Sequence, residues 1–196
     1  MQIPLLHRHM NKIALYILIF LIVIYLLIMS QKIIDLRAVL PVHANQKRVF
    51  PKRKLAQIDT IIVHHTAGPT TQTVRQIAQY HIGSSSHVCQ GGCPGILYHY
   101  MINRAGKIYW VNSLENVVYH ATPMNTRGIG ICLIGNFDKI EPNQVQLDAL
   151  DYLIKKTRKD FSQPLRVIGH HDACGGCKTC PGANLYPILS KYNAQA

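Results

Sequence analysis

The sequence predicts an α/β protein: a single domain with a central mixed β-sheet flanked by helices, preceded by one N-terminal transmembrane helix. Three observations predict it. Short β-branched runs alternate with segments of helical period, and one long apolar run stands near the N-terminus. The length of 196 residues suits one domain once that run is set aside. The folded part that we predict, residues 57–196, has 140 residues, enough to bury one hydrophobic core.

The apolar run extends from Ile13 to Met29, where every residue is apolar or Tyr. At 1.5 Å per residue it gives about 25 Å of helix, at the short end of what a bilayer core of about 30 Å requires. The alternative is a cleaved signal peptide, whose apolar region is usually shorter, about 7–15 residues. We therefore predict a short tail over residues 1–12 and a transmembrane signal-anchor over residues 13–30, which would hold the protein in the cytoplasmic membrane as a single-pass, lipid-contacting protein.

The formal net charge of +12 is concentrated near the N-terminus, because residues 1–54 contain nine Lys and Arg but one acidic residue, Asp35. A basic run of this kind can bind nucleic acid, but no aromatic interleaving or base-reading motif accompanies it. We therefore expect no nucleic acid partner. We interpret residues 31–56, interrupted by Pro41 and Pro51, as a basic stalk that lies on anionic lipid or wall polymer, or is simply solvated.

The orientation of the predicted anchor is not decided by its flanking charges. Arg8 and Lys12 precede the apolar run, while Lys32 and Arg37 follow it, so the positive-inside count is close to a tie. The six cysteines are compatible with an oxidising compartment without requiring one. Only the function of the domain can choose between the two sides of the membrane.

The chain beyond residue 57 alternates between strand-like and helix-like patterns. We predict strands over 60–64, 96–102, 107–111, 129–134 and 167–169, and helices over 71–81, 142–161 and 182–191. The helix over 142–161 is the clearest, with apolar residues at helical spacing and Lys and Arg in its last turns, where cations suit the helix dipole. These elements define one domain over residues 57–196, which we expect to be a monomer.

Two pairs of adjacent histidines close predicted strands: His64 with His65, and His170 with His171. Such a pair alone is more often a core or surface imidazole than a ligand. Cys180, ten residues after His170, changes this interpretation, because two imidazoles and one thiolate are zinc-type ligands. The sequence signatures of the His-Glu-x-x-His metalloproteases and of the zinc deaminases are absent.

Five sequence blocks resemble the N-acetylmuramoyl-L-alanine amidase type 2 family, which includes phage amidase-lysozymes and the peptidoglycan recognition proteins. The blocks are residues 61–67 (IIVHHTA), 97–100 (LYHY), 129–135 (IGICLIG), 169–172 (GHHD) and 178–182 (KTCPG). They stand in the order of the family, and the similarity spans roughly residues 57–190. The resemblance implies that residues 57–196 form a zinc amidase domain, whose partner is peptidoglycan and whose reaction is hydrolysis of the amide between N-acetylmuramic acid and L-alanine.

The resemblance also implies roles for single residues. By position, three residues would bind Zn²⁺ and two would be catalytic: His64, His170 and Cys180 for the metal, and Tyr98 and Lys178 for the reaction. The tyrosine hydroxyl would donate to the developing oxyanion or orient the water, and the lysine would add positive charge there. His120 matches a family histidine near the substrate groove, or is a plain surface imidazole. Asp172 would orient a ligand imidazole, or is a solvated loop carboxylate.

The departures from the family pattern bear on the type of activity. Muropeptide-recycling members carry a glutamate in the strand where this chain has Cys132, so the chain follows the Tyr/Lys pattern instead. Receptor-type members often lack the ligand cysteine, whereas this chain retains Cys180. The resemblance therefore favours an extracytoplasmic wall hydrolase, with a cytoplasm-facing recycling amidase and a non-catalytic peptidoglycan-binding receptor as the alternatives.

Four further cysteines stand near the predicted site: Cys89 and Cys93, and Cys174 and Cys177. The two spacings, Cys-x-x-x-Cys and Cys-x-x-Cys, suit either a structural zinc site or two disulfides in an exported protein. The family motif does not include these positions. We favour disulfides and leave the zinc alternative open.

Overall fold

The computed structural model describes residues 12, 14–21 and 32–193, which belong to two units, Met1–Lys32 and Ile33–Ala196. In the first unit, residues 12 and 14–21 are helical. Within the described ranges, no helix is both long and apolar enough to cross a membrane. The predicted tail over residues 1–12 and signal-anchor over residues 13–30 fall largely outside the described residues.

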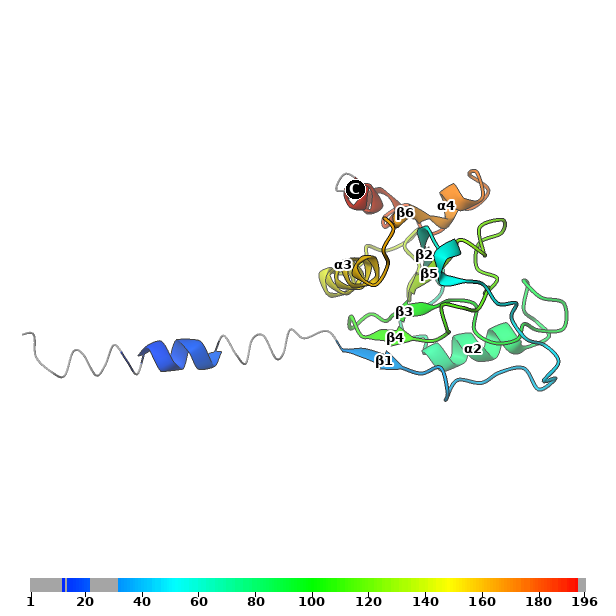
Figure 1. Cartoon of the computed structure of the whole chain (residues 1–196), viewed down its shortest axis with the longest axis horizontal. Coiled ribbons are helices and arrows are strands. Elements are labelled where there is room, and N and C mark those ends of the chain that lie inside the picture. Colours follow the sequence, from blue (N-terminus) through cyan, green and yellow to red (C-terminus); the bar gives the residue numbers. More distant parts are fainter. Residues whose placement is uncertain (1–11, 13, 22–31, 194–196) are drawn as a thin grey trace, which may run out of the picture. The chain divides into compact units, whose positions relative to one another are not determined.

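The second unit is built on a six-stranded mixed sheet (Figure 1). In chain order the strands are β1 (Ile33–Asp35), β2 (Thr60–His65), β3 (Tyr100–Ile102), β4 (Ile108–Trp110), β5 (Gly128–Leu133) and β6 (Arg166–Gly169). Their order in the sheet is β1-β4-β3-β5-β2-β6, and all neighbours are parallel except the hairpin of β3 and β4. Every residue of β2 and β5 is buried, as the continuous apolar runs of central parallel strands require.

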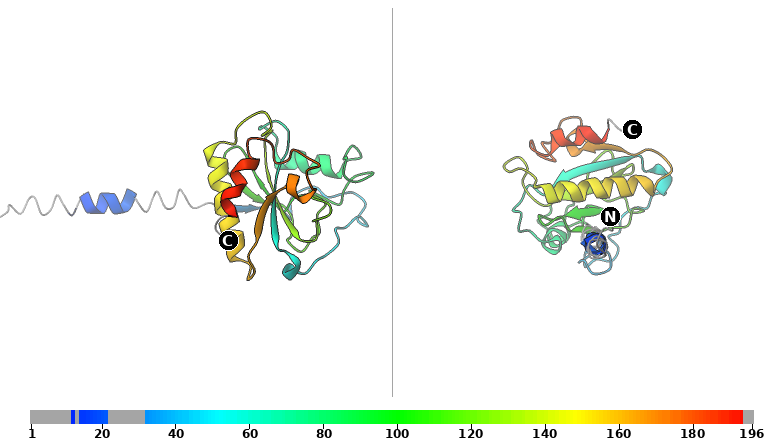
Figure 2. Two further views of the ribbon diagram at one scale, coloured as in Figure 1. Left: turned by 90° about the horizontal axis from the view of Figure 1, so that it is seen from above. Right: turned by 90° about the vertical axis from the view of Figure 1, so that its left-hand side faces the viewer.

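Helices cover the two faces of this sheet (Figure 2). The long helix α3 (Gln144–Lys159) packs with the 3₁₀ helix η2 (Tyr186–Tyr192) on one face, and α2 (Val74–Ile82) packs on the other. Both α-helices begin at a side-chain cap: Thr73 accepts a hydrogen bond from the Gln76 amide, and Asn143 does so from Gln146. This arrangement confirms the predicted α/β domain with a central mixed sheet flanked by helices.

Two predicted elements differ from the observed ones. The strand predicted over 96–102 is regular only from Tyr100. In its first residues, side chains form hydrogen bonds with main-chain groups that would otherwise pair with a neighbouring strand. The Leu97 amide donates to His81 Nδ1, and the Ile96 carbonyl accepts from Asn112. The helix predicted over 182–191 forms only as η2, with Pro187 in its first turn. Three short elements, β1, η1 (Leu55–Gln57) and α4 (His170–Ala173), were not predicted.

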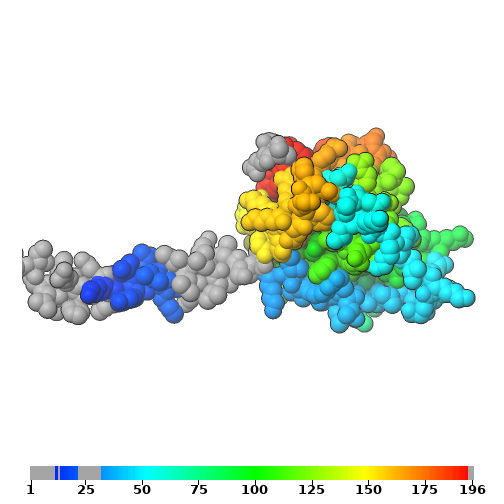
Figure 3. Space-filling view, viewed as in Figure 1, coloured from blue at the N-terminus to red at the C-terminus, as the bar shows by residue number. Residues whose placement is uncertain are grey.

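The interpretation of residues 31–56 as a basic stalk is corrected from Ile33 onward. Strand β1 pairs in parallel with β4, with Ile33 opposite Ile108, and Arg37 stacks 3.3 Å above the centre of the Trp110 ring. Arg53 is only 6% exposed. Figure 3 shows this part of the unit, in light blue to cyan, packed against the rest of the domain surface. Its basic residues are therefore partly structural rather than solvated.

Candidate metal centre

Three predicted ligands come together beyond the carboxyl ends of β2 and β6. His64 lies near the end of β2, His170 begins α4 directly after β6, and Cys180 follows in the next loop. One ligand-type atom from each lies within 4.8 Å of the others. The His64 and His170 ring centres are 4.7 Å apart, and His64 Nδ1 lies 3.6 Å from Cys180 Sγ. This is the arrangement that the histidine pairs and the cysteine predicted.

The parallel pairing of β2 and β6 brings the two histidines together. Val63 lies opposite Gly169 in the register, so the residues that follow, His64 in β2 and His170 just beyond the end of β6, lie at the same level of the sheet. A Cβ at Gly169 would come within 2.8 Å of Pro181 and Tyr186 side chains. The glycine therefore allows the loop that carries Cys180 to pack closely on the strand end.

Asp172 does not orient an imidazole. Its Oδ2 accepts a hydrogen bond from the Gly169 amide at 2.9 Å, and its Oδ1 accepts one from the Tyr186 hydroxyl. The carboxylate thus caps the first turn of α4 and ties that turn to η2. It stabilises the backbone from which His170 extends.

Burial of the three candidate ligands shifts their pKa values and so determines which of them carry a proton. His64 is 1% exposed, and burial holds its pKa well below the ordinary value. The pKa of His170 is lowered by burial and then by the nearby charge of Lys178. Both imidazoles are therefore neutral near pH 7, the form that binds a metal. Burial also raises the pKa of the Cys180 thiol to about 12, whereas a cation beside the sulfur would favour the thiolate.

His120 contacts His64 on the side away from Cys180. It is 6% exposed, so it is not a surface imidazole. Its Nδ1 is 2.9 Å from His64 Nε2, and its Nε2 is 3.3 Å from the Gly128 carbonyl oxygen. A carbonyl only accepts, so His120 Nε2 carries the ring proton, and Nδ1 accepts from His64 Nε2–H. His64 Nδ1 is then left unprotonated on the side of Cys180. Both ring nitrogens of His120 are thus engaged with protein atoms.

Alternate glycines on β5 make room for the His120 ring. A Cβ at Gly130 would lie 2.9 Å from His120 Cγ and Nδ1, and one at Gly128 would lie 3.1 Å from Cε1. Because side chains alternate along a strand, both glycines present the same face of β5. The ring lies on this bare stretch of backbone beside β2.

Tyr98 and Lys178 line the same cavity as the three candidate ligands, a cleft of about 320 Å³. The Tyr98 ring is half-buried, with its centre 5.2 Å from that of His64. Burial, followed by the neighbouring Cys132 and Cys180, raises its pKa well above the usual value. The Tyr98 hydroxyl therefore remains protonated and able to donate at neutral pH. Lys178 is exposed at the rim.

The second histidine of each pair bonds to main-chain atoms outside the ligand cluster. His65 Nδ1 accepts a hydrogen bond from the Phe137 amide at 3.1 Å. His171 Nδ1 lies 2.7 Å from the Lys178 carbonyl oxygen and donates to it. No sequence motif pointed to Asp138, which also lines the cleft. Its carboxylate accepts from the Thr179 hydroxyl and the Ala183 amide, and so holds the loop that carries Cys180.

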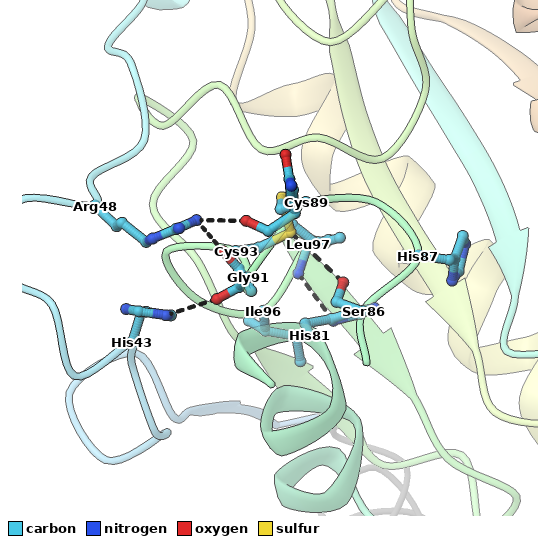
Figure 4. The surroundings of a disulfide bond; sticks show 12 residues. His43, Arg48, His81, Ser86, His87, Cys89, Gly91, Cys93, Ile96 and Leu97 are labelled. Atoms are coloured by element: carbon cyan, nitrogen blue, oxygen red, sulfur yellow. Dashed lines mark hydrogen bonds between the residues drawn. A yellow bond between two sulfur atoms is a disulfide. The ribbon is translucent and has the colours of Figure 1, made fainter. Parts of the chain in front are cut away.

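The four additional cysteines form two local disulfides, Cys89–Cys93 and Cys174–Cys177. The favoured interpretation therefore agrees with the structure, and Cys132 is a free, buried cysteine. Figure 4 shows the first disulfide closing a loop that is also held from outside by His43 and Arg48, which bond to main-chain carbonyls of residues 90–92. The loop leading into this disulfide contributes His87 and Val88 to the wall of the cleft.

Comparison with known proteins agrees with the observed fold and with the resemblance that the sequence blocks indicate. The sequence profile of the family described as N-acetylmuramoyl-L-alanine amidase matches residues 54–183. The chain is 27% identical over 140 residues to peptidoglycan-recognition protein SD of Drosophila simulans, covering 67% of this chain and 71% of that protein. It is similar to the solved endolysin amidase LysCS from Clostridium intestinale URNW, with a TM-score of 0.63 and 25% identity over 84% of this chain and 94% of that one. The fold is also that of the Ph2119 endolysin from Thermus scotoductus MAT2119 bacteriophage Ph2119, with a TM-score of 0.67 and 22% identity over 82% and 98% of the two chains.

Proposed function

Because the chain belongs to the N-acetylmuramoyl-L-alanine amidase family, we propose that it hydrolyses the amide between N-acetylmuramic acid and L-alanine of peptidoglycan in a zinc-dependent reaction. The observation that carries this proposal is the convergence of His64, His170 and Cys180 within 4.8 Å on a cleft that Tyr98 and Lys178 also line. Two neutral imidazoles and a thiolate suit zinc, and three protein ligands are typical of its catalytic sites. When bound there, zinc would polarise the scissile carbonyl and acidify a water molecule.

The residues of the chain have distinct tasks in this proposal. His64 would offer Nδ1 to the metal, because its Nε2 keeps the ring proton and donates it in a hydrogen bond to His120 Nδ1. Tyr98 donates its hydroxyl proton in a hydrogen bond to the oxygen on which negative charge develops, and its raised pKa keeps that proton available. Lys178 adds a positive charge at the rim of the same cleft, which favours the transition state over the neutral amide.

Catalysis is supported over binding alone by the residues that the cleft retains. A receptor that only binds peptidoglycan has no need of a thiolate ligand, yet Cys180 is present beside both histidines. Cys132 lies opposite His64 in the sheet register and is fully buried. Burial raises the pKa of the Cys132 thiol well above its usual value, so it does not replace a glutamate base. The Tyr98 and Lys178 pair is the catalytic set that the cleft contains.

The identity of the broken bond tests this function. Purified full-length protein with zinc is incubated with defined muropeptides, and the products are identified by mass. We expect a glycan with a free lactyl carboxylate and a peptide that begins with alanine. Products cut within the glycan or within the stem peptide would contradict the proposal.

Replacing His120 with alanine is expected to weaken zinc binding about 10- to 100-fold, the usual effect of losing a hydrogen-bond partner of a ligand histidine. His64 would then be free to carry its proton on Nδ1 and to turn its ring. Competition with a chromophoric chelator measures the zinc affinity. His87→Ala is the matched control, since this exposed imidazole lines the same cleft without a hydrogen bond to a candidate ligand. Equal zinc affinity in both variants would remove His120 from the metal centre.

We also propose that the domain lies outside the cytoplasmic membrane, where the wall is, with Met1 in the cytoplasm. The support is the apolar run of residues 13–29 together with the proposed substrate. Protease added to intact spheroplasts is expected to digest the domain while an N-terminal tag stays protected. Digestion only after permeabilisation would reverse the orientation and favour the recycling amidase instead.

A further inference from the structure

Arg53 is buried against His99 and the start of β5, although it belongs to the basic segment that the sequence predicts to be a stalk. It is 6% exposed, and its guanidinium group contacts three separate stretches of the chain. Nε donates to the carbonyl of Leu114 at 2.7 Å, and Nη1 donates to the carbonyls of Asn125, Thr126 and Gly128 at 3.0, 3.0 and 2.8 Å. Nη2 lies 2.9 Å from His99 Nε2.

This environment is unusual for a buried cation. Among the described residues, the hydrogen bonds of Arg53 include none to a carboxylate. Buried charges are normally paired, because removing a charge from water is energetically costly. Here main-chain carbonyls replace the counter-ion, so the planar group holds these carbonyls in fixed positions.

One of these carbonyls is shared with His120. The Gly128 oxygen accepts from Arg53 Nη1 at 2.8 Å and faces His120 Nε2 at 3.3 Å. The same arginine therefore fixes the acceptor that decides which nitrogen of His120 is protonated. His120 in turn contacts His64 Nε2 at 2.9 Å. A continuous chain of hydrogen bonds joins the arginine to a candidate metal ligand.

Arg53 also supports the other walls around His120. The carbonyls of Asn125 and Thr126 belong to the turn between His120 and β5, so this turn is tied to the strand that follows it. The His99 ring stands edge-on to His120 with 5.7 Å between ring centres. His99 Nδ1 is anchored to β5 by the Gly130 amide at 3.0 Å. The guanidinium group thus contacts the turn, the strand and the neighbouring ring together.

We propose that Arg53 is a positioning residue of the metal centre, acting through the Gly128 carbonyl and His120 to keep His64 Nδ1 directed to the metal. The metal part of this inference rests on the proposed function. Without Arg53, the Gly128 carbonyl and the turn at residues 125–126 lose their common donor, and His120 is free to turn or to exchange its proton. We expect a loss of zinc affinity of about tenfold, at the lower end of the range for partners of ligand histidines, because Arg53 acts one step further away.

The first test compares zinc affinity in three variants of the full-length protein, with zinc alone as the ligand. Arg53→Gln should weaken zinc binding about tenfold, and Arg53→Lys, which retains a charge and a donor, should recover part of the loss. Arg158→Gln is the matched control. Arg158 also holds main-chain carbonyls, those of Leu165 and Tyr192, but it extends from α3 on the other face of the sheet. It should lose folding stability without losing zinc affinity.

The second test reads the tautomer of His64 directly, and its wild-type measurement does not require any variant to fold. Nitrogen NMR of the zinc-free wild-type protein should show the proton on Nε2, and Arg53→Lys should show a mixture of tautomers. A proton on Nδ1 in the wild type would overturn the proposal, as would wild-type zinc affinity in both Arg53 variants. A protein that binds zinc with the expected Arg53 dependence but breaks no amide would contradict the proposed function and leave this inference standing.

Discussion

Replacing Cys180 with serine is expected to remove the bound zinc and to reduce hydrolysis below detection. The thiolate is the only anionic member of the cluster, and a serine hydroxyl of similar size stays protonated and binds zinc poorly. Metal analysis should fall from about one zinc per chain, the content of a mononuclear site, to nearly none. His64→Ala should give the same result, because it removes the most buried ligand.

The control for this prediction is Cys132→Ala. Cys132 is the second free cysteine among the described residues and lies opposite His64 in the sheet, but its sulfur is not part of the ligand cluster. This variant should lose some stability and keep its zinc. Full zinc occupancy in Cys180→Ser and His64→Ala would show that the metal, if any, binds elsewhere.

Replacing Lys178 with alanine is expected to leave zinc in place and to slow hydrolysis about 10²–10³-fold. This corresponds to about 2.7–4 kcal/mol, the typical effect of removing one group that stabilises the developing oxyanion. The rate is measured with saturating muropeptide, so that weaker binding does not imitate a slower reaction.

Lys155→Ala controls for the lost charge. Lys155 is exposed on α3, where it pairs with Asp151 at 2.7 Å, and it does not line the cleft. Its replacement lowers the net charge by the same amount and should leave the rate unchanged. A wild-type rate in Lys178→Ala would exclude the lysine from the catalytic set.

The elements that could be predicted from the sequence have a strong local signal. Strand β2 is a β-branched run bounded by polar residues, and α3 keeps its apolar period over 16 residues. Strand β1 has no such signal, because its three residues are stabilised by distant pairing with β4. The basic residues around it favoured a linker instead.

The site residues divide in the same way, into those with a local sequence signal and those that depend on distant contacts. The candidate ligands could be predicted because each stands in a short block next to a strand end. The contact of His120 with His64 could not, since it joins residues 56 positions apart and depends on the bare backbone of β5. The burial of Arg53 depends on distant carbonyls, from a loop, a turn and the first residue of β5, while its sequence neighbours are exposed lysines. A run of charges predicts solvent exposure, and only the folded chain shows where main-chain oxygens replace water.

We expect the cleft to turn over peptidoglycan rather than only bind it. The most direct measurement counts new alanine amino groups released from insoluble peptidoglycan per molecule of zinc-loaded protein, with Cys180→Ser in parallel. We predict many released amines per molecule of wild-type protein, and almost none after chelation or in the variant. Wild-type protein that sediments with the wall and releases no alanine amines would contradict the account and identify the domain as a receptor.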